Sequence, residues 1–142
     1  MLYNKLFLAL LGASSAHAYA SRMEFAKLGL TEAQPKILYI LNRADGIVQK
    51  ELAELCNIRQ STLTVILSKM ENQNYIYKET CYVSGKKRAY KVCLTEKGKE
   101  KAEQLEHIIE KLENKGFEGF TEEEKQTILK LLERIEKNMQ SY

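Results

Sequence analysis

The segment Val48–Leu94 constrains this chain most, because two short helix patterns are followed directly by two strand patterns. In the first helix pattern, the apolar residues between Leu52 and Cys56 are spaced so that they share one face. The pattern breaks at residues 57–59, and a second helix is predicted over Gln60–Asn72. Two short helices joined by so brief a break are typical of a helix-turn-helix.

The second predicted helix has two contrasting faces. Its apolar residues follow the spacing of a buried stripe: Leu63, Ile66, Leu67 and Met70. The residues left to point outward are Arg59, Gln60, Ser61, Thr62, Thr64, Val65, Ser68 and Lys69. Almost all of them donate or accept hydrogen bonds and none is acidic, so this face suits the base edges of a DNA major groove. Asn74 is predicted to cap the helix in a left-handed conformation.

The next predicted element is a β-hairpin. Residues Tyr75–Tyr82 and Arg88–Leu94 are rich in aromatic and β-branched side chains, with Ser84-Gly85 as a turn between them. The tip carries three consecutive basic residues: Lys86, Lys87 and Arg88. A hairpin beside the second helix would place this charge against phosphates or in a minor groove. The alternative is an ordinary solvated turn.

Charge is distributed unevenly along the chain, although the net charge is only +3. Residues 48–94 contain eight Lys or Arg and four Glu, whereas residues 95–142 contain nine Lys or Arg and twelve Glu. The basic middle therefore coincides with the predicted helix-turn-helix and hairpin, which favours a nucleic-acid partner for that segment.

Several short motifs then follow one another in a familiar order: Leu30-Thr31-Glu32-Ala33-Gln34, Glu51-Leu52-Ala53, Ser61-Thr62-Leu63-Thr64, Arg88, and Leu94-Thr95-Glu96-Lys97-Gly98. In this order and spacing the chain resembles the MarR-type transcriptional regulators, from about Phe25 to its end. The resemblance implies an obligate homodimer that binds a pseudo-palindromic operator and represses transcription. It also implies a small molecule or an oxidant that reduces the affinity for DNA.

The chain departs from the family pattern at three positions. Lys86 stands where an Asp usually lies two residues before the hairpin arginine, Asn74 stands where Gly is frequent, and Val65 stands where a basic residue is frequent. The first departure predicts that Arg88 is either freer than usual or held by Glu79. The last departure, Val65, predicts a narrower or different base preference.

The two ends of the chain predict helices with apolar faces. In the first, expected over Met1–Leu28, the apolar residues are Leu2, Leu6, Phe7, Leu8, Leu10, Leu11, Ala13, Ala20 and Met23, a stripe wider than one core face needs. Thr95 can cap a helix to about Lys115, and Thr121 with Glu124 forms a capping box for a last helix. Unpaired apolar helices favour a symmetric homodimer, and the alternative is a helical cap folded back on its own domain.

These patterns predict one mainly α chain, residues 1–142, with a small β-hairpin wing. Residues 31–99 form the winged helix-turn-helix lobe, and residues 1–30 and 100–142 form the helical dimerisation region. An effector pocket is expected where the first helix meets the winged lobe, because a ligand there would change the spacing of the recognition helices. The weak candidates for it are His17, Arg22 and Tyr39, each of which is more often a structural residue.

Other classes of protein fit less well. Residues 1–20 resemble a secretory signal, but the apolar run is short and its removal would take away the first dimerisation helix. The scattered Glu of the C-terminal helices, such as Glu106, are interpreted as a solvated face, and no catalytic constellation, metal spacing or phosphate-binding loop is apparent. We therefore expect no enzyme activity, no cofactor, no membrane segment and a cytoplasmic location.

The three cysteines are an odd number and do not make a disulfide framework. A turn at the hairpin tip would put Cys81 opposite a residue near Tyr90 and Cys93 opposite one near Lys78, so the two would not face each other. All three, including Cys56, are predicted to be small buried hydrophobic residues, and redox sensing is the alternative.

The sequence thus predicts a DNA-binding transcriptional regulator. The competing hypothesis keeps the fold and replaces DNA with a protein partner. A protein-binding face should expose apolar side chains near its centre, whereas only Val65 is apolar on the outward face of the second helix and the hairpin tip is basic.

Overall fold

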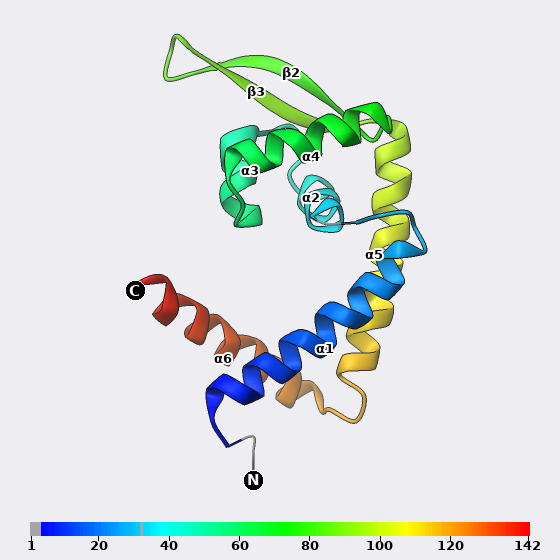
Figure 1. The fold of residues 1–142 in the computed structure, drawn as a ribbon, viewed down its shortest axis with the longest axis vertical. Helices are drawn as coiled ribbons and strands as arrows, with labels where there is room; N and C mark the ends of the chain where they lie inside the picture. Colours follow the sequence, from blue (N-terminus) through cyan, green and yellow to red (C-terminus); the bar gives the residue numbers. More distant parts are fainter. Residues whose placement is uncertain (1–3, 32) are drawn as a thin grey trace. The chain divides into compact units, whose positions relative to one another are not determined.

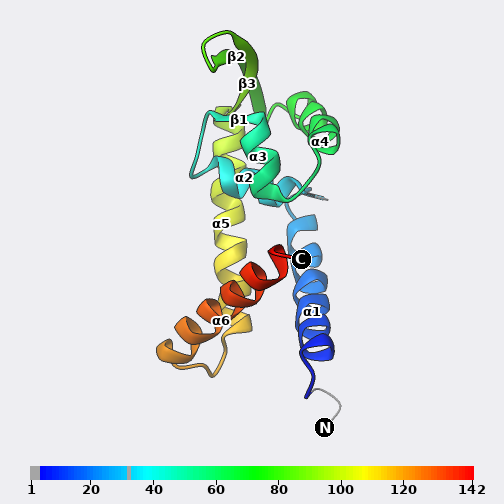
Figure 2. The same cartoon turned by 90° about the vertical axis from the view of Figure 1, so that its left-hand side faces the viewer.

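The computed structural model describes residues 4–31 and 33–142. In chain order its elements are α1 (Leu6–Ala26), α2 (Gln34–Leu41), β1 (Ile47–Val48), α3 (Gln49–Cys56), α4 (Gln60–Asn72), β2 (Ile76–Val83), β3 (Lys87–Leu94), α5 (Glu96–Gly116) and α6 (Glu122–Gln140) (Figures 1 and 2). The chain forms two compact units, one ending at Glu110 and the other running over Lys111–Tyr142. The mainly α fold with a small sheet confirms the predicted fold class.

The predicted helix-turn-helix is formed by α3 and α4, which share a core, and α4 has the predicted bounds. Both helices end before an asparagine in the left-handed region, Asn57 with φ 56° and Asn74 with φ 64°. Asn tolerates this conformation better than other non-glycine residues, which explains why both chain reversals are tight. The core beneath the two helices consists of Leu38, Leu41, Leu52, Cys56, Leu63, Leu67 and Met70, all 0% exposed.

The wing is a hairpin within a three-stranded antiparallel sheet of order β1-β3-β2. Its tip turns at Ser84 and Gly85, which both have positive φ, 50° and 81°, so the predicted turn is confirmed. The hairpin runs beside α4 and its tip stands clear of the helices (Figures 1 and 2). Strand β1 was missed by the sequence analysis because two residues are too few to show an alternating pattern.

The register of the wing agrees with the expected one. Cys81 pairs with Ala89, next to Tyr90, and Cys93 pairs with Tyr77, next to Lys78. The two cysteines remain far apart along the hairpin, and all three cysteines are free. Cys56 and Cys93 are buried as predicted, but Cys81 is only half-buried because it lies in the part of the wing beyond the core.

A close contact fixes the wing to the start of α5. The Thr95 hydroxyl donates to the Asn74 carbonyl at 2.6 Å and accepts from the Gly98 N–H at 2.9 Å, so Thr95 caps the helix as predicted. A Cβ at Gly98 would overlap the Tyr75 carbonyl oxygen, so only glycine fits this position. The base of the wing and the first turn of α5 therefore hold each other in place.

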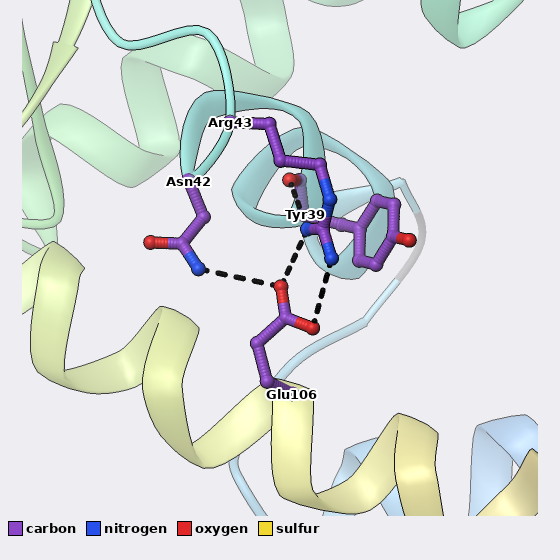
Figure 3. A network of polar contacts seen from close by, with 4 residues as sticks. All are labelled: Tyr39, Asn42, Arg43 and Glu106. Carbon is purple, nitrogen blue, oxygen red and sulfur yellow. Dashed lines mark hydrogen bonds and ion pairs between the residues drawn. The ribbon is translucent and has the colours of Figure 1, made fainter.

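A polar network joins the end of α2 to α5 (Figure 3). The Arg43 guanidinium donates to both Glu106 carboxylate oxygens, at 2.5 and 3.2 Å, and Asn42 donates to the same carboxylate at 3.3 Å. Arg43 also stacks on the Tyr39 ring, 3.6 Å from its centroid. The interpretation of Glu106 as part of a solvated face was wrong, because its partners lie more than sixty residues away in sequence.

The helices at the two ends carry exposed apolar side chains. α1 begins at Leu6 rather than Met1 and exposes Phe7, Leu11 and Met23. Leu2 of the expected apolar stripe and Glu32 of the motif before α2 lie outside the described residues. The predicted capping box of α6 is present, with Thr121 and Glu124 bonded reciprocally at 2.9 and 3.1 Å. No helix in the described part of the chain is long and apolar enough to cross a membrane.

Candidate nucleic-acid interface

Helix α4 presents the face that the sequence singled out. Because Leu63, Leu67 and Met70 are completely buried, the opposite side of the helix faces outward. The recognition residues predicted around this helix are all exposed: Arg59, Gln60, Ser61, Thr62, Thr64, Ser68 and Lys69. The core thus fixes the rotation of α4 and offers a row of polar side chains to a partner.

One member of that row, Thr64, is already held by its neighbours. Its hydroxyl accepts a hydrogen bond from the Gln49 amide at 2.8 Å and donates one to the Gln60 carbonyl at 2.9 Å. With its only donor used, Thr64 can offer a new partner its methyl group and the remaining lone pair of its hydroxyl. Gln49 had not been recognised in the sequence, since nothing in its local pattern indicates that the first residue of α3 reaches α4.

The wing tip is exposed and basic. Lys86, Lys87 and Arg88 are all exposed, as expected. Of the two expectations for Arg88, pairing with Glu79 is wrong: Glu79 lies opposite Lys91 in the sheet, and successive residues of a strand alternate between faces. The Arg88 guanidinium instead lies over the Tyr90 ring, 5.5 Å from its centroid.

A groove of about 480 Å³ separates the wing from the start of α4. Its lining includes Gln60 and Thr64 from α4, Lys87 and Arg88 from the wing, and four residues that the sequence analysis did not select: Gln49, Lys50, Lys78 and Tyr90. Among the described residues, the lining carries four cationic side chains and no carboxylate. Such a surface attracts an anion and offers hydrogen-bonding groups beside it.

The groove brings together only part of the predicted set. Gln60, Thr64, Lys87 and Arg88 line it, whereas the remaining predicted residues are exposed outside it: Arg59, Ser61, Thr62, Ser68, Lys69 and Lys86. Lys78 had no motif to mark it, and it is placed by an ion pair with Glu71 at 3.6 Å. The whole surface, groove and flanking residues together, is called the α4–wing surface below.

The three effector candidates are not brought together. Arg22 lines a hollow of about 270 Å³, and the other described residues in its walls are Phe25, Ala26, Leu30, Thr31 and Pro35. Tyr39 belongs to the network of Arg43 and Glu106, and His17 is exposed on α1 outside the hollow. Arg22 is therefore the one candidate that adjoins an apolar cavity.

The titratable groups with shifted pKa values lie outside the groove. The hydrogen bonds from Arg43 lower the pKa of the Glu106 carboxyl from its ordinary value. Burial raises the pKa of the Cys56 and Cys93 thiols. Because the thiolate is the reactive form, both thiols are less reactive than exposed ones, which favours the structural interpretation of these cysteines.

The fold and the α4–wing surface define a winged helix-turn-helix protein, and comparisons with known proteins agree. Residues 30–86 match the model of the MarR family. A Bacillus subtilis strain 168 protein named as an uncharacterized HTH-type transcriptional regulator, YybA, is 35% identical over 120 residues, which cover 84% of this chain and 79% of the relative. The chain belongs to the MarR family of transcriptional regulators, a family of regulators rather than of enzymes.

Solved structures show the same fold. A MarR protein from Peptoclostridium difficile is 26% identical, with a TM-score of 0.82 over 97% of this chain and 90% of that protein. A MarR-family regulator from Listeria monocytogenes, solved with a 26mer DNA, has a TM-score of 0.83 over 96% of this chain and 89% of that one. At 22% identity the second likeness concerns the fold alone.

Proposed function

We propose that this chain is a homodimeric repressor that binds a pseudo-palindromic operator through its α4–wing surface. The observation that carries the proposal is the groove directly beside the polar face of α4, which the described residues line with four cations and no carboxylate. Phosphates bind such cations without regard to sequence, and the neighbouring polar face can then read base edges.

The roles of the individual residues follow from their free groups. The Gln60 side chain makes no hydrogen bond within the described residues, so its amide can pair with adenine, and the Thr64 methyl group suits the methyl of thymine. Arg59, Ser61, Thr62 and Ser68 extend this face toward bases or phosphates, and Lys69 is placed for a phosphate. Lys86, Lys87 and Arg88 would bind the backbone or enter the adjacent minor groove.

Related structures support a DNA partner. The Listeria monocytogenes protein was solved with a 26mer DNA, and a cysteine-to-serine mutant of MarR from Escherichia coli was solved with operator DNA. Both proteins share this fold. The basic α4–wing surface of this chain has the charge that binding to a DNA duplex requires. For a regulator of this family that binds DNA we propose a cytoplasmic location.

The dimer rests on a separate observation. α1 exposes Leu6, Phe7 and Leu11, at 48%, 76% and 53%, and α6 exposes Leu131 and Leu132, at 43% and 42%. Apolar faces of this extent on terminal helices favour isologous contacts with a second copy. A two-fold axis would also present two α4 helices to half-sites one turn of DNA apart.

We further propose that a small-molecule effector relieves repression by binding the hollow beside Arg22. Its walls are mainly apolar, with the cationic Arg22 among them, which suits a small apolar molecule carrying a carboxylate. The hollow lies between the end of α1 and the start of α2, so a ligand that preferred one spacing of these helices would change the affinity for DNA.

A salt titration tests the proposal. Binding to the duplex upstream of this protein's own gene is compared with binding to a scrambled duplex of equal length by fluorescence anisotropy. We expect tighter binding to the first duplex, with log K falling by about 0.9 per log unit of salt for each phosphate bound. Weak, equal and salt-insensitive binding to both duplexes would favour the competing hypothesis, in which the same fold binds a protein partner and not DNA.

The variant Arg88→Ala sharpens this experiment. It should weaken binding to both duplexes and reduce the salt slope by about one for each wing, because one phosphate contact is lost there. An unchanged affinity and an unchanged slope would show that the wing does not touch DNA.

A further inference from the structure

We propose that Tyr90 is the positioning residue for the wing arginine: its ring orients the Arg88 guanidinium within the groove without neutralising the charge. The inference rests on the proposed DNA-binding function. In it, Tyr90 affects DNA binding only by orienting Arg88. Its basis is the geometry of one face of the wing.

Tyr90 and Arg88 lie two residues apart on β3, so their side chains project from the same face of the sheet. The guanidinium carbon is 5.5 Å from the ring centroid, within the range of about 6 Å over which a cation is attracted to an aromatic face. Both side chains line the groove together with Gln60 and Thr64. The stack therefore places Arg88 toward the polar face of α4.

No carboxylate performs this task in the described part of the wing. Glu79 pairs in register with Lys91, on the sheet face opposite to Arg88. Glu71, the acidic residue at the end of α4, is paired with Lys78 at 3.6 Å. The Tyr90 ring is thus the group that engages Arg88.

An aromatic ring and a carboxylate would orient the arginine with different consequences. A carboxylate accepts hydrogen bonds from the guanidinium and cancels its charge, so a phosphate has to displace it. The ring attracts the cation through its electron-rich face and leaves the N–H groups free. Arg88 thereby keeps both its full charge and its donors for the duplex while its range of positions is restricted.

A double-mutant cycle with Arg88→Ala separates positioning from direct contact. The variants Tyr90→Phe and Tyr90→Leu are compared in the wild-type and Arg88→Ala backgrounds, by anisotropy with the upstream duplex. Tyr90→Phe keeps the ring and should bind as the wild type does. Tyr90→Leu should weaken binding about two- to five-fold for each wing, the expected effect of an exposed cation–ring contact, and should have no further effect after Arg88→Ala.

Tyr77→Leu is the matched control, because Tyr77 is 45% exposed on the opposite face of the same hairpin. It should leave the affinity unchanged, and thermal melts should show that every variant folds. If Tyr90→Leu weakened binding equally in both backgrounds, or if Tyr90→Phe weakened it as much, Tyr90 would act by itself and the proposal would be overturned.

A measurement without DNA keeps this inference separate from the proposed function. The NMR shift of the Arg88 Nε proton should be displaced upfield by the Tyr90 ring in the wild type and in Tyr90→Phe, and return to its ordinary value in Tyr90→Leu. If no duplex binds, the operator proposal fails, and the shift still decides whether the stack exists. An unshifted proton in the wild type would overturn the positioning role.

Discussion

Helices α4 and α6 carry the same kind of apolar stripe but differ in what covers it. The stripe residues of α4, Leu63, Ile66, Leu67 and Met70, are at most 6% exposed, whereas Leu131, Leu132 and Met139 of the α6 stripe are 42–57% exposed. The spacing in both is that of an amphipathic helix. A periodic pattern therefore predicts that a helix has an apolar face, and it leaves open whether the covering partner is the same chain or another.

The largest effect is expected from truncating the covered face. Leu67→Ala removes a completely buried side chain from the core under α4 and should lower the free energy of unfolding by about 3 kcal/mol. Urea denaturation measures this. Val65→Ala is the control on the same helix, because Val65 is 71% exposed. A similar loss in both variants would show that the stripe of α4 is not the core of this lobe.

The uncovered face should respond in a different assay. Leu132→Ala should weaken association of the proposed dimer by about 2 kcal/mol in total, or about 1 kcal/mol per protomer, as measured by sedimentation equilibrium. The effect per protomer is below the full burial energy of a leucine because Leu132 is 42% exposed in the single chain. The effect of Leu132→Ala on unfolding should vanish at protein concentrations where the chain is monomeric. Lys130→Ala, an exposed neighbour, should change neither. If the wild type, Leu132→Ala and Lys130→Ala associated equally well, Leu132 of α6 would not be part of the dimer interface.

The same contrast explains what the sequence could predict. The helix-turn-helix, the wing and the exposed recognition face depend on local periodicity, on Asn57 and Asn74, and on one Ser-Gly turn, so each is visible within a short window. Gln49 and Lys78 are held in the groove by contacts with Thr64 and Glu71, which lie 15 and 7 positions away in the sequence. Glu106 meets Arg43 across 63 positions, and no local pattern encodes such a pair.

The face of α4 that remains open should determine base preference rather than stability. Gln60→Ala should reduce the discrimination between the upstream and scrambled duplexes by about 1–3 kcal/mol, because one bidentate base contact is lost. Anisotropy with both duplexes measures it. The unfolding free energy should change by less than about 0.5 kcal/mol, since Gln60 is exposed. An equal loss of affinity for both duplexes would show that Gln60 contacts the sugar-phosphate backbone of DNA and not a base.

The smallest effect is expected at the contact between the end of α2 and α5, which belongs to neither apolar face. The pKa of Glu106 is lowered by hydrogen bonds from Arg43, so the folded state binds its proton less readily than the unfolded state does. The stabilisation is therefore fully present above the ordinary carboxyl pKa of about 4.3, and is lost as the pH falls through the lower folded value.

Glu106→Gln should lower the unfolding free energy at neutral pH by only about 0.5–1 kcal/mol, because the Glu106 side chain is 30% exposed and that of Arg43 is 50% exposed. The difference from the wild type should shrink in acid, as measured by urea denaturation from neutral pH down to strongly acidic solution. Glu103→Gln, on an exposed position of the same helix, should show no such convergence. A gap between wild type and Glu106→Gln that stayed constant with pH would mean that packing of the side chain, and not its charge, joins α2 to α5.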